Sequence, residues 1–199
     1  MNISVFGSKE QWKELMPGAV EGVTLVTDLN ELSPASSAII VLDDSVKLDW
    51  SRFTQPVFIN AVNNTLSEMS AGNNIVRFNG WPGFIGKKKW EIAGLPSEAA
   101  LSVLRILEKE ASFVEDQIGF VAPRIISMII NEAFFALEEE VSTRAEIDTA
   151  MKLGTNYPFG PFDWCARIGP RQVLELLYKL STRDRRYHPC HLLEQEAQL

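Results

Sequence analysis

The side chains best suited to acid–base or metal chemistry are few in this sequence. The chain of 199 residues holds two histidines, His188 and His191, and two cysteines, Cys165 and Cys190. The histidines flank Cys190, a grouping that could begin a metal site, but Pro189 interrupts the helix that would align the two imidazoles. We therefore expect no bound metal and two reduced, unbridged thiols.

Two short basic clusters are the next candidates, because they could meet an anionic ligand. Residues 87–89 are three lysines, and residues 183–186 hold three arginines around Asp184. Such clusters are usually solvated loops, and the alternative is a landing site for a phosphorylated molecule. The whole chain is acidic, with 19 basic and 26 acidic residues and a net charge of −7. This balance argues against a nucleic-acid partner and against an anionic membrane surface.

A glycine follows the first apolar run, where a dinucleotide-binding fold places its phosphate loop. That loop needs the pattern G-x-G-x-x-G, because backbone amides at the start of a helix must approach a pyrophosphate. Residues 7–12 read GSKEQW, so only Gly7 is present, and Lys9 and Trp12 occupy the other two glycine places. Trp12 would hold the helix away from the strand, and Glu10 would repel an anion. Gly7 is thus only a remnant of a cofactor site.

The first half of the chain alternates apolar runs with polar segments. The apolar runs predict strands at residues 3–6, 23–27, 38–42, 56–60, 74–78 and 89–93, with a short helix at residues 9–16. Runs that are almost wholly apolar suit strands covered on both faces, as in a parallel sheet. We expect an α/β domain over residues 1–116.

The rest of the chain reads as helices. Helix-start signals and apolar periodicity predict helices at residues 96–109, 125–137, 143–154 and 161–168, and one that begins at Pro170. Thr143 and Glu146 have the spacing of a capping box, and that helix is expected to end at Gly154, since glycine favours helix ends. We expect an all-α domain over residues 117–199. The long apolar helix at 125–137 predicts a homodimer, because an exposed patch of that size would aggregate.

Four segments near the end of the chain resemble one known family. Residues 148–154 read DTAMKLG, residues 157–162 read YPFGPF, residues 116–124 read DQIGFVAPR, and residues 187–193 read YHPCHLL. Together they resemble the C-terminal domain of the 3-hydroxyacyl-CoA dehydrogenases, whose patterns are close to IDxAMKLGxxxPMGPF, DxPGFxxNR and YxPxxLL. Cap and turn residues explain much of the motif, so it indicates ancestry better than activity.

This resemblance implies a fold of the class α/β plus all-α. It would be a shortened Rossmann-like parallel-sheet domain followed by a helical dimerisation domain, similar to the C-terminal fold of 6-phosphogluconate dehydrogenase. Residues 27–41 look like a family segment that normally lies later in the chain. On that alignment the family's second strand, its ribose-binding acid and the helices that follow are deleted. Asp28 then occupies the ribose acid's spacing only by coincidence.

The resemblance also implies where catalytic residues should lie. The family's HFFNPxPxMxxVE motif supplies a histidine general base and a glutamate that orients it. Residues 76–84 read VRFNGWPGF, so Val76 or Arg77 stands in place of the histidine. Glu91 is the only remnant of the catalytic pair, and it has no imidazole to orient. In addition, Pro123 replaces the asparagine of GFxxNR.

The family's substrate-binding segment NTSS is matched by residues 60–63, which read NAVN and lack the serine. Basic side chains nearby could meet the phosphates of coenzyme A by charge-assisted hydrogen bonds. The candidate ligand-binding residues are Asn60, Asn63, Arg77, Lys88 and Arg124. For the basic members of this set, the alternative is a surface loop around Lys88 and a salt bridge at Arg124.

We therefore predict a degenerate relative of the 3-hydroxyacyl-CoA dehydrogenases that lacks NAD-dependent hydride transfer and needs no cofactor. It would bind an acyl-CoA-like ligand in the cleft between its halves, or act only as a dimeric partner. Two alternatives stay open: an active dehydrogenase of fatty-acid metabolism with relocated catalytic groups, and a pure interaction module. No export signal and no membrane-spanning run is visible, so the expected location is the cytoplasm.

Overall fold

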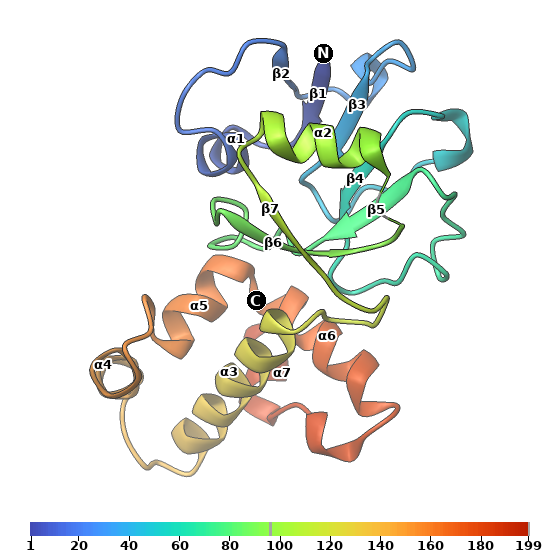
Figure 1. The fold of residues 1–199 in the computed structure, drawn as a ribbon. Coiled ribbons are helices and arrows are strands. Elements are labelled where there is room, and N and C mark those ends of the chain that lie inside the picture. The colour runs from blue at the N-terminus through green and yellow to red at the C-terminus, as the bar shows by residue number, and fades with distance from the viewer. Residues whose placement is uncertain (96, 199) are drawn as a thin grey trace. The chain divides into compact units, whose positions relative to one another are not determined.

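The computed structural model describes residues 1–95 and 97–198, and it divides into two compact units, Met1–Phe120 and Val121–Leu199 (Figure 1). The sequence places the domain boundary after Asp116, four residues before this division. Pro96, which we expected to open a helix, lies outside the described residues.

The first unit is built on one sheet of seven strands in the order β2-β1-β3-β4-β5-β6-β7. The strands are β1 Ile3–Phe6, β2 Val23–Val26, β3 Ala38–Val41, β4 Val57–Asn60, β5 Ile75–Phe78, β6 Lys89–Ala93 and β7 Glu110–Phe113. β1 to β5 pair in parallel, β6 runs antiparallel to β5, and β7 runs parallel to β6. The six strands expected from the sequence are confirmed, and β7 is an addition.

The parallel strands are buried because alternate side chains enter two separate cores. Ile40 and Phe58 face a core that also contains side chains of α1, Lys9–Leu15, and α2, Glu98–Ile106. Ile39 and Ile59 face the opposite core, which is closed by side chains such as Trp50 in the short 3-10 turn η2, Trp50–Arg52. This period of two explains why the strands read as continuous apolar runs.

The connections of this sheet are much reduced for a doubly wound fold. Among the described residues, the links from β2 to β3, from β3 to β4 and from β4 to β5 contain no α-helix, only turns and the 3-10 segments η1, Leu29–Glu31, and η2. The usual Rossmann strand order is 3-2-1-4-5-6, in which two strands lie on the outer side of strand 1. In this sheet only β2 lies on that side of β1. The first unit is therefore a shortened Rossmann-like sheet, as the sequence predicts.

The second unit is all helical. It consists of α3 Ala122–Glu138, α4 Arg144–Thr155, α5 Pro161–Ile168, α6 Pro170–Ser181, the 3-10 turn η3 Arg185–Tyr187, and α7 His191–Glu196. α3 packs against α5, α6 and α7, which explains why its apolar side chains cover more than one stripe. The capping box of Thr143 and Glu146 is confirmed.

The expected end of α4 is wrong by one residue. Gly154 lies within the helix, and Asn156 takes the left-handed conformation at its end, with φ of +57°. Asparagine tolerates this conformation better than most residues, so glycine was not needed there. No helix among the described residues is long and apolar enough to span a bilayer.

Candidate functional site

The turn between β1 and α1 is closed by hydrogen bonds of its own. The Ser8 hydroxyl accepts from the Gln11 backbone amide at 3.2 Å, and the Gln11 side-chain oxygen accepts from the Ser8 amide at 2.9 Å. The Gln11 side-chain amide then donates to the carbonyl of Leu42, 3.0 Å away at the end of β3. Two of the backbone donors at this helix start, which would otherwise be open to an anion, are thus occupied.

The space above the first glycine is filled as well. A Cβ added to Gly7 would lie 2.9 Å from the Gln11 side-chain oxygen and 2.9 Å from the Leu42 Cβ. Gly7 is therefore needed for close packing between β1, α1 and β3. This contact accounts for the glycine without any bound cofactor.

Asn60 bridges the ends of three neighbouring strand segments. Its side-chain amide donates to the carbonyl of Leu42 at 2.8 Å and to that of Gly80 at 3.0 Å, while its oxygen accepts from the Gly80 amide at 3.0 Å. The side chain is buried, and a Cβ on Gly80 would lie 2.5 Å from the Asn60 Cγ. Asn60, predicted as a ligand-binding residue, instead holds the loops after β3 and β5.

These contacts decide whether a dinucleotide fits this chain. In open parallel sheets, ligands bind beyond the carboxyl ends of the strands at the topological switch point, which here lies between β1 and β3. Gln11 and Asn60 meet at that point on one carbonyl, that of Leu42. The backbone amides that should approach a pyrophosphate are used by Ser8 and Gln11. The residues present do not fit NAD bound in the manner of this fold.

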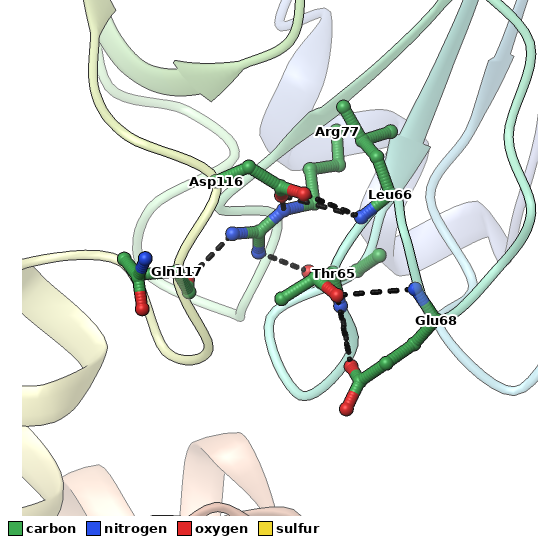
Figure 2. A network of polar contacts seen from close by, with 7 residues as sticks. Thr65, Leu66, Glu68, Arg77, Asp116 and Gln117 are labelled. Carbon is green, nitrogen blue, oxygen red and sulfur yellow. Dashed lines mark hydrogen bonds and ion pairs between the residues drawn. The ribbon is translucent and has the colours of Figure 1, made fainter.

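Arg77, on β5, lies in a buried polar network (Figure 2). Its Nε pairs with an oxygen of Asp116 at 2.5 Å, one terminal nitrogen donates to the Ala61 carbonyl at 2.9 Å, and the other donates to the Gln117 carbonyl. The guanidinium carbon lies 4.1 Å from the ring centre of Phe120. This buried charge is satisfied on every side, as a charge removed from water must be.

Asp116 extends the network to a neighbouring loop. Its two oxygens accept from the Leu66 backbone amide at 3.2 and 3.0 Å, and the adjacent Thr65 amide donates to Glu68 at 2.7 Å (Figure 2). Arg77 thus ties residues 116–120 to the loop that follows β4. The structure gives Arg77 an anchoring role rather than an open site for a phosphate.

Glu91, the remnant of the catalytic pair, lies on β6 beside the end of β5. The side-chain amide of Asn79 donates to its carboxylate at 3.1 Å, and the Asn79 backbone amide donates to its carbonyl at 3.1 Å. Both histidines of the chain lie in the second unit. One partner of this carboxylate is therefore a side-chain amide, which cannot accept a proton as an imidazole does.

Another predicted residue of the first unit, Lys88, is engaged by a carboxylate. Lys88 forms an ion pair with Glu110 at 2.7 Å, and that hydrogen bond raises the pKa of the exposed Lys88 ammonium and lowers the pKa of Glu110. Asn63 is buried and follows Asn60 closely in the sequence. Arg124 lies in the first turn of α3, in the second unit. The structure brings Asn60 and Arg77 onto adjacent strands, and Lys88 is engaged separately.

The family-like motif of the second unit acts structurally. The two oxygens of Asp148, on α4, accept from the backbone amides of Phe162 at 2.8 Å and Asp163 at 3.1 Å, so Asp148 caps α5. A Cβ on Gly160 would lie 2.3 Å from the Asp148 Cγ. The side chain of Asn131 likewise holds the segment before α7. It donates to the His188 carbonyl at 2.9 Å and accepts from the Cys190 backbone amide at 2.8 Å.

Sequence reasoning missed the roles of Gln11 and Asp116. The spacing of Ser8 and Gln11 is a capping-box signal and could have revealed the closed turn. The Arg77–Asp116 pair spans 39 residues, and nothing in the sequence indicates which carboxylate meets this arginine.

Comparison with known proteins identifies the second unit. Residues 119–199 match the family model described as 3-hydroxyacyl-CoA dehydrogenase, C-terminal domain. The chain is 40% identical over 109 residues to the 3-hydroxyadipyl-CoA dehydrogenase of Escherichia coli, a match covering 52% of this chain and 23% of that protein. It is 39% identical over 101 residues to a probable 3-hydroxybutyryl-CoA dehydrogenase of Bacillus subtilis, covering 48% and 35%.

Solved structures agree on the fold. The crystal structure of Mycobacterium tuberculosis FadB2 covers 99% of this chain and 93% of its own, with a TM-score of 0.73 at 16% identity, which supports the fold alone. That of a 3-hydroxybutyryl-CoA dehydrogenase from Escherichia coli is 31% identical with a TM-score of 0.60, covering 71% of this chain and 31% of its own. The chain thus spans only 23% to 35% of the length of the Escherichia coli and Bacillus subtilis relatives that it matches.

Proposed function

From the premise that this chain belongs to the 3-hydroxyacyl-CoA dehydrogenase family through its C-terminal unit, we propose that it is a member that does not transfer hydride. The single observation that carries the proposal is the closed switch point, where Gln11 and Asn60 share the Leu42 carbonyl. A nicotinamide cofactor would need these positions open.

The missing base supports the same proposal. Oxidation of a hydroxyl group needs a residue that removes its proton, and family members use a histidine oriented by a glutamate. Glu91 is bonded to Asn79, and Arg77 is committed to Asp116. With Val76 and Arg77 at the histidine's place, the first unit offers no imidazole to a substrate.

We further propose that the chain binds an acyl-CoA-like ligand without converting it. Support comes from the relatives, whose names describe dehydrogenases of CoA thioesters. Among the predicted ligand residues, Lys88 and Arg124 are the pair to test first, because each carries the positive charge that a coenzyme A phosphate would meet, while the charge of Arg77 is buried and paired with Asp116. An interaction module without a ligand is the competing outcome.

Hydride transfer is tested by mixing the protein with NADH and acetoacetyl-CoA. The absorbance of NADH is followed for long enough to detect slow turnover. We expect no oxidation of NADH and no saturable change in NADH fluorescence on adding the protein. A catalytically active family relative, assayed in parallel, controls for the reagents. Turnover that disappears in a Glu91→Gln variant would instead support an active dehydrogenase with relocated groups.

Ligand binding is tested by quenching of tryptophan fluorescence with acetoacetyl-CoA alone. Saturable quenching that weakens in Lys88→Gln or Arg124→Gln supports the ligand proposal, and free adenosine serves as the control for inner-filter effects. A flat titration rejects the ligand and favours the interaction module.

We also propose that the helical unit pairs two copies of the chain. Apolar side chains remain exposed on it, with Ile125 of α3 52% exposed and Leu153 of α4 83% exposed. Exposed apolar side chains grouped on helices often mark contacts between subunits.

A further inference from the structure

A small hollow on the second unit has the side chains of an anion site. Its volume is about 270 Å³, and it is lined by Ser181, Arg185 and His188. Ser181 is the last residue of α6, Arg185 begins η3, and His188 follows η3 directly. Eight consecutive residues thus bring a hydroxyl, a guanidinium and an imidazole around one hollow.

The backbone around the hollow is fixed by the core. The Tyr187 amide donates to the Asp184 carbonyl, the His188 amide donates to the Arg185 carbonyl at 3.1 Å, and the side chain of Tyr187 is buried. The His188 carbonyl accepts from Asn131 of α3 at 2.9 Å. Because the backbone is already ordered, a ligand would lose little binding free energy in fixing it.

The charges of the turn leave Arg185 available. The acid within the cluster, Asp184, pairs with Arg186 at 3.1 Å and also accepts from the Arg186 backbone amide. Across the described part of the chain, the exposed side chains of Arg185 and His188 form no hydrogen bond or ion pair. The carboxylate of Glu194, which interacts electrostatically with His188, is bonded to Tyr178 and His191, and these hydrogen bonds hold the pKa of Glu194 below its usual range.

We propose that this hollow binds the phosphate group of a small phosphorylated molecule. An arginine fork and an imidazole N–H are donors suited to phosphate oxygens, and Arg183 adds positive charge to the same turn. The Ser181 hydroxyl now donates to the Tyr178 carbonyl at 2.8 Å, so it joins only by rotating. The volume lies below the range of about 300–1,000 Å³ typical of sites for larger ligands, so it suits a phosphate group rather than a whole cofactor.

The site lies wholly within the second unit and uses no residue of the closed switch point. It does not rest on the proposed loss of hydride transfer, and each proposal can fail alone.

The chain's two histidines allow a direct test. Imidazole signals of the full chain are followed by nuclear magnetic resonance during titration with inorganic phosphate, and then with phenyl phosphate as a monoester. We expect a saturable shift of the His188 signal that exceeds any shift of His191, whose ring contacts Glu194 and Gln195. Sodium chloride at matched ionic strength is the control, and a His188→Gln variant assigns the signals.

Two arginine variants separate a specific site from general charge. Arg185→Gln should weaken phosphate binding by about tenfold or more, as expected on losing a charged hydrogen-bond donor. Arg105→Gln removes an equal charge from an exposed arginine of the first unit and should leave binding unchanged. Tighter binding of phenyl phosphate points to a monoester, and equal binding points to the free ion. A linear titration, or equal weakening by both variants, overturns the proposal.

Discussion

Arg77 illustrates how a buried charged side chain can take a structural role. Its donors meet a carboxylate and two carbonyls, and an aromatic ring covers its face. A charge enters a protein interior only when such partners compensate for its lost hydration. Arg77 therefore contributes to the position of residues 116–120, which lead out of the sheet.

Replacing Arg77 by alanine should destabilise the first unit strongly, because Asp116 would be left without its charged partner. We expect a loss of about 3–5 kcal/mol in the free energy of unfolding, measured by urea denaturation followed by tryptophan fluorescence. Arg105→Ala, at an exposed ion pair, should change stability by less than about 0.5 kcal/mol. Equal effects of the two variants would contradict the anchoring role.

Residue roles were predictable only where partners lie close in sequence. The absent glycines of the first turn were visible directly, and the pair Ser8 and Gln11 follows a known local pattern. Arg77 was assigned to a ligand because its partner Asp116 is remote in sequence. Asn60 was assigned likewise, although its acceptors at Leu42 and Gly80 are backbone atoms that leave no trace in residue types.

At the scale of elements, the DTAMKLG segment and the YPFGPF segment together cap the start of α5. Asp148 of α4 supplies both oxygens to the free amides of α5, and Gly160 leaves room for that carboxylate. Negative charge at a helix start is also favoured by the helix dipole. The motif thus fixes how two helices pack, and it says nothing about catalysis.

Asp148→Ala should weaken the second unit by about 0.5–2 kcal/mol, the usual loss on removing a helix cap. The change is measured as a shift of the urea midpoint monitored by circular dichroism. Glu175→Ala, an exposed acid on α6 with a weak partner 4.0 Å away, is the matched control. A midpoint for Asp148→Ala within error of the control would refute the capping role.

The sequence predicted six strands because buried parallel strands are strongly apolar, and it missed β7 because Glu110–Phe113 is a partly exposed strand at the sheet edge. The strand order could not be read from the sequence, since hydrophobic patterns carry no information about neighbours. The capping box at the start of α4 was predictable because it involves residues close in sequence. The end of α4 at Asn156 depended on the backbone conformation of one residue.

At the scale of the molecule, two units were predictable from the change in periodicity along the chain. The likeness of the helical unit to the C-terminal domain of the 3-hydroxyacyl-CoA dehydrogenases followed from its motifs, which are long and specific. The activity did not follow, because function depends on side-chain geometry, which the motifs of the helical unit do not describe.

The proposed homodimer gives a prediction for the whole molecule. Ile125→Lys places a charge on the exposed side of α3 and should shift the chain toward monomers by at least about tenfold in dissociation constant. Sedimentation velocity across a concentration series measures this shift. Lys47→Glu, a charge change in the first unit, should leave association as it is. A wild-type chain that stays monomeric at all concentrations would refute the dimer.

The closed switch point has a consequence for how such a protein can evolve. Gln11 of α1 and Asn60 of β4 both bond to the end of β3, and Asn60 also bonds to the loop after β5, so they contribute to the stability of the sheet. Restoring a glycine at Lys9 or Trp12 would leave these bonds in place, and removing them first would weaken the fold before any cofactor could compensate. We therefore expect that opening this turn to a nucleotide would take several substitutions and would lower the stability of the sheet first.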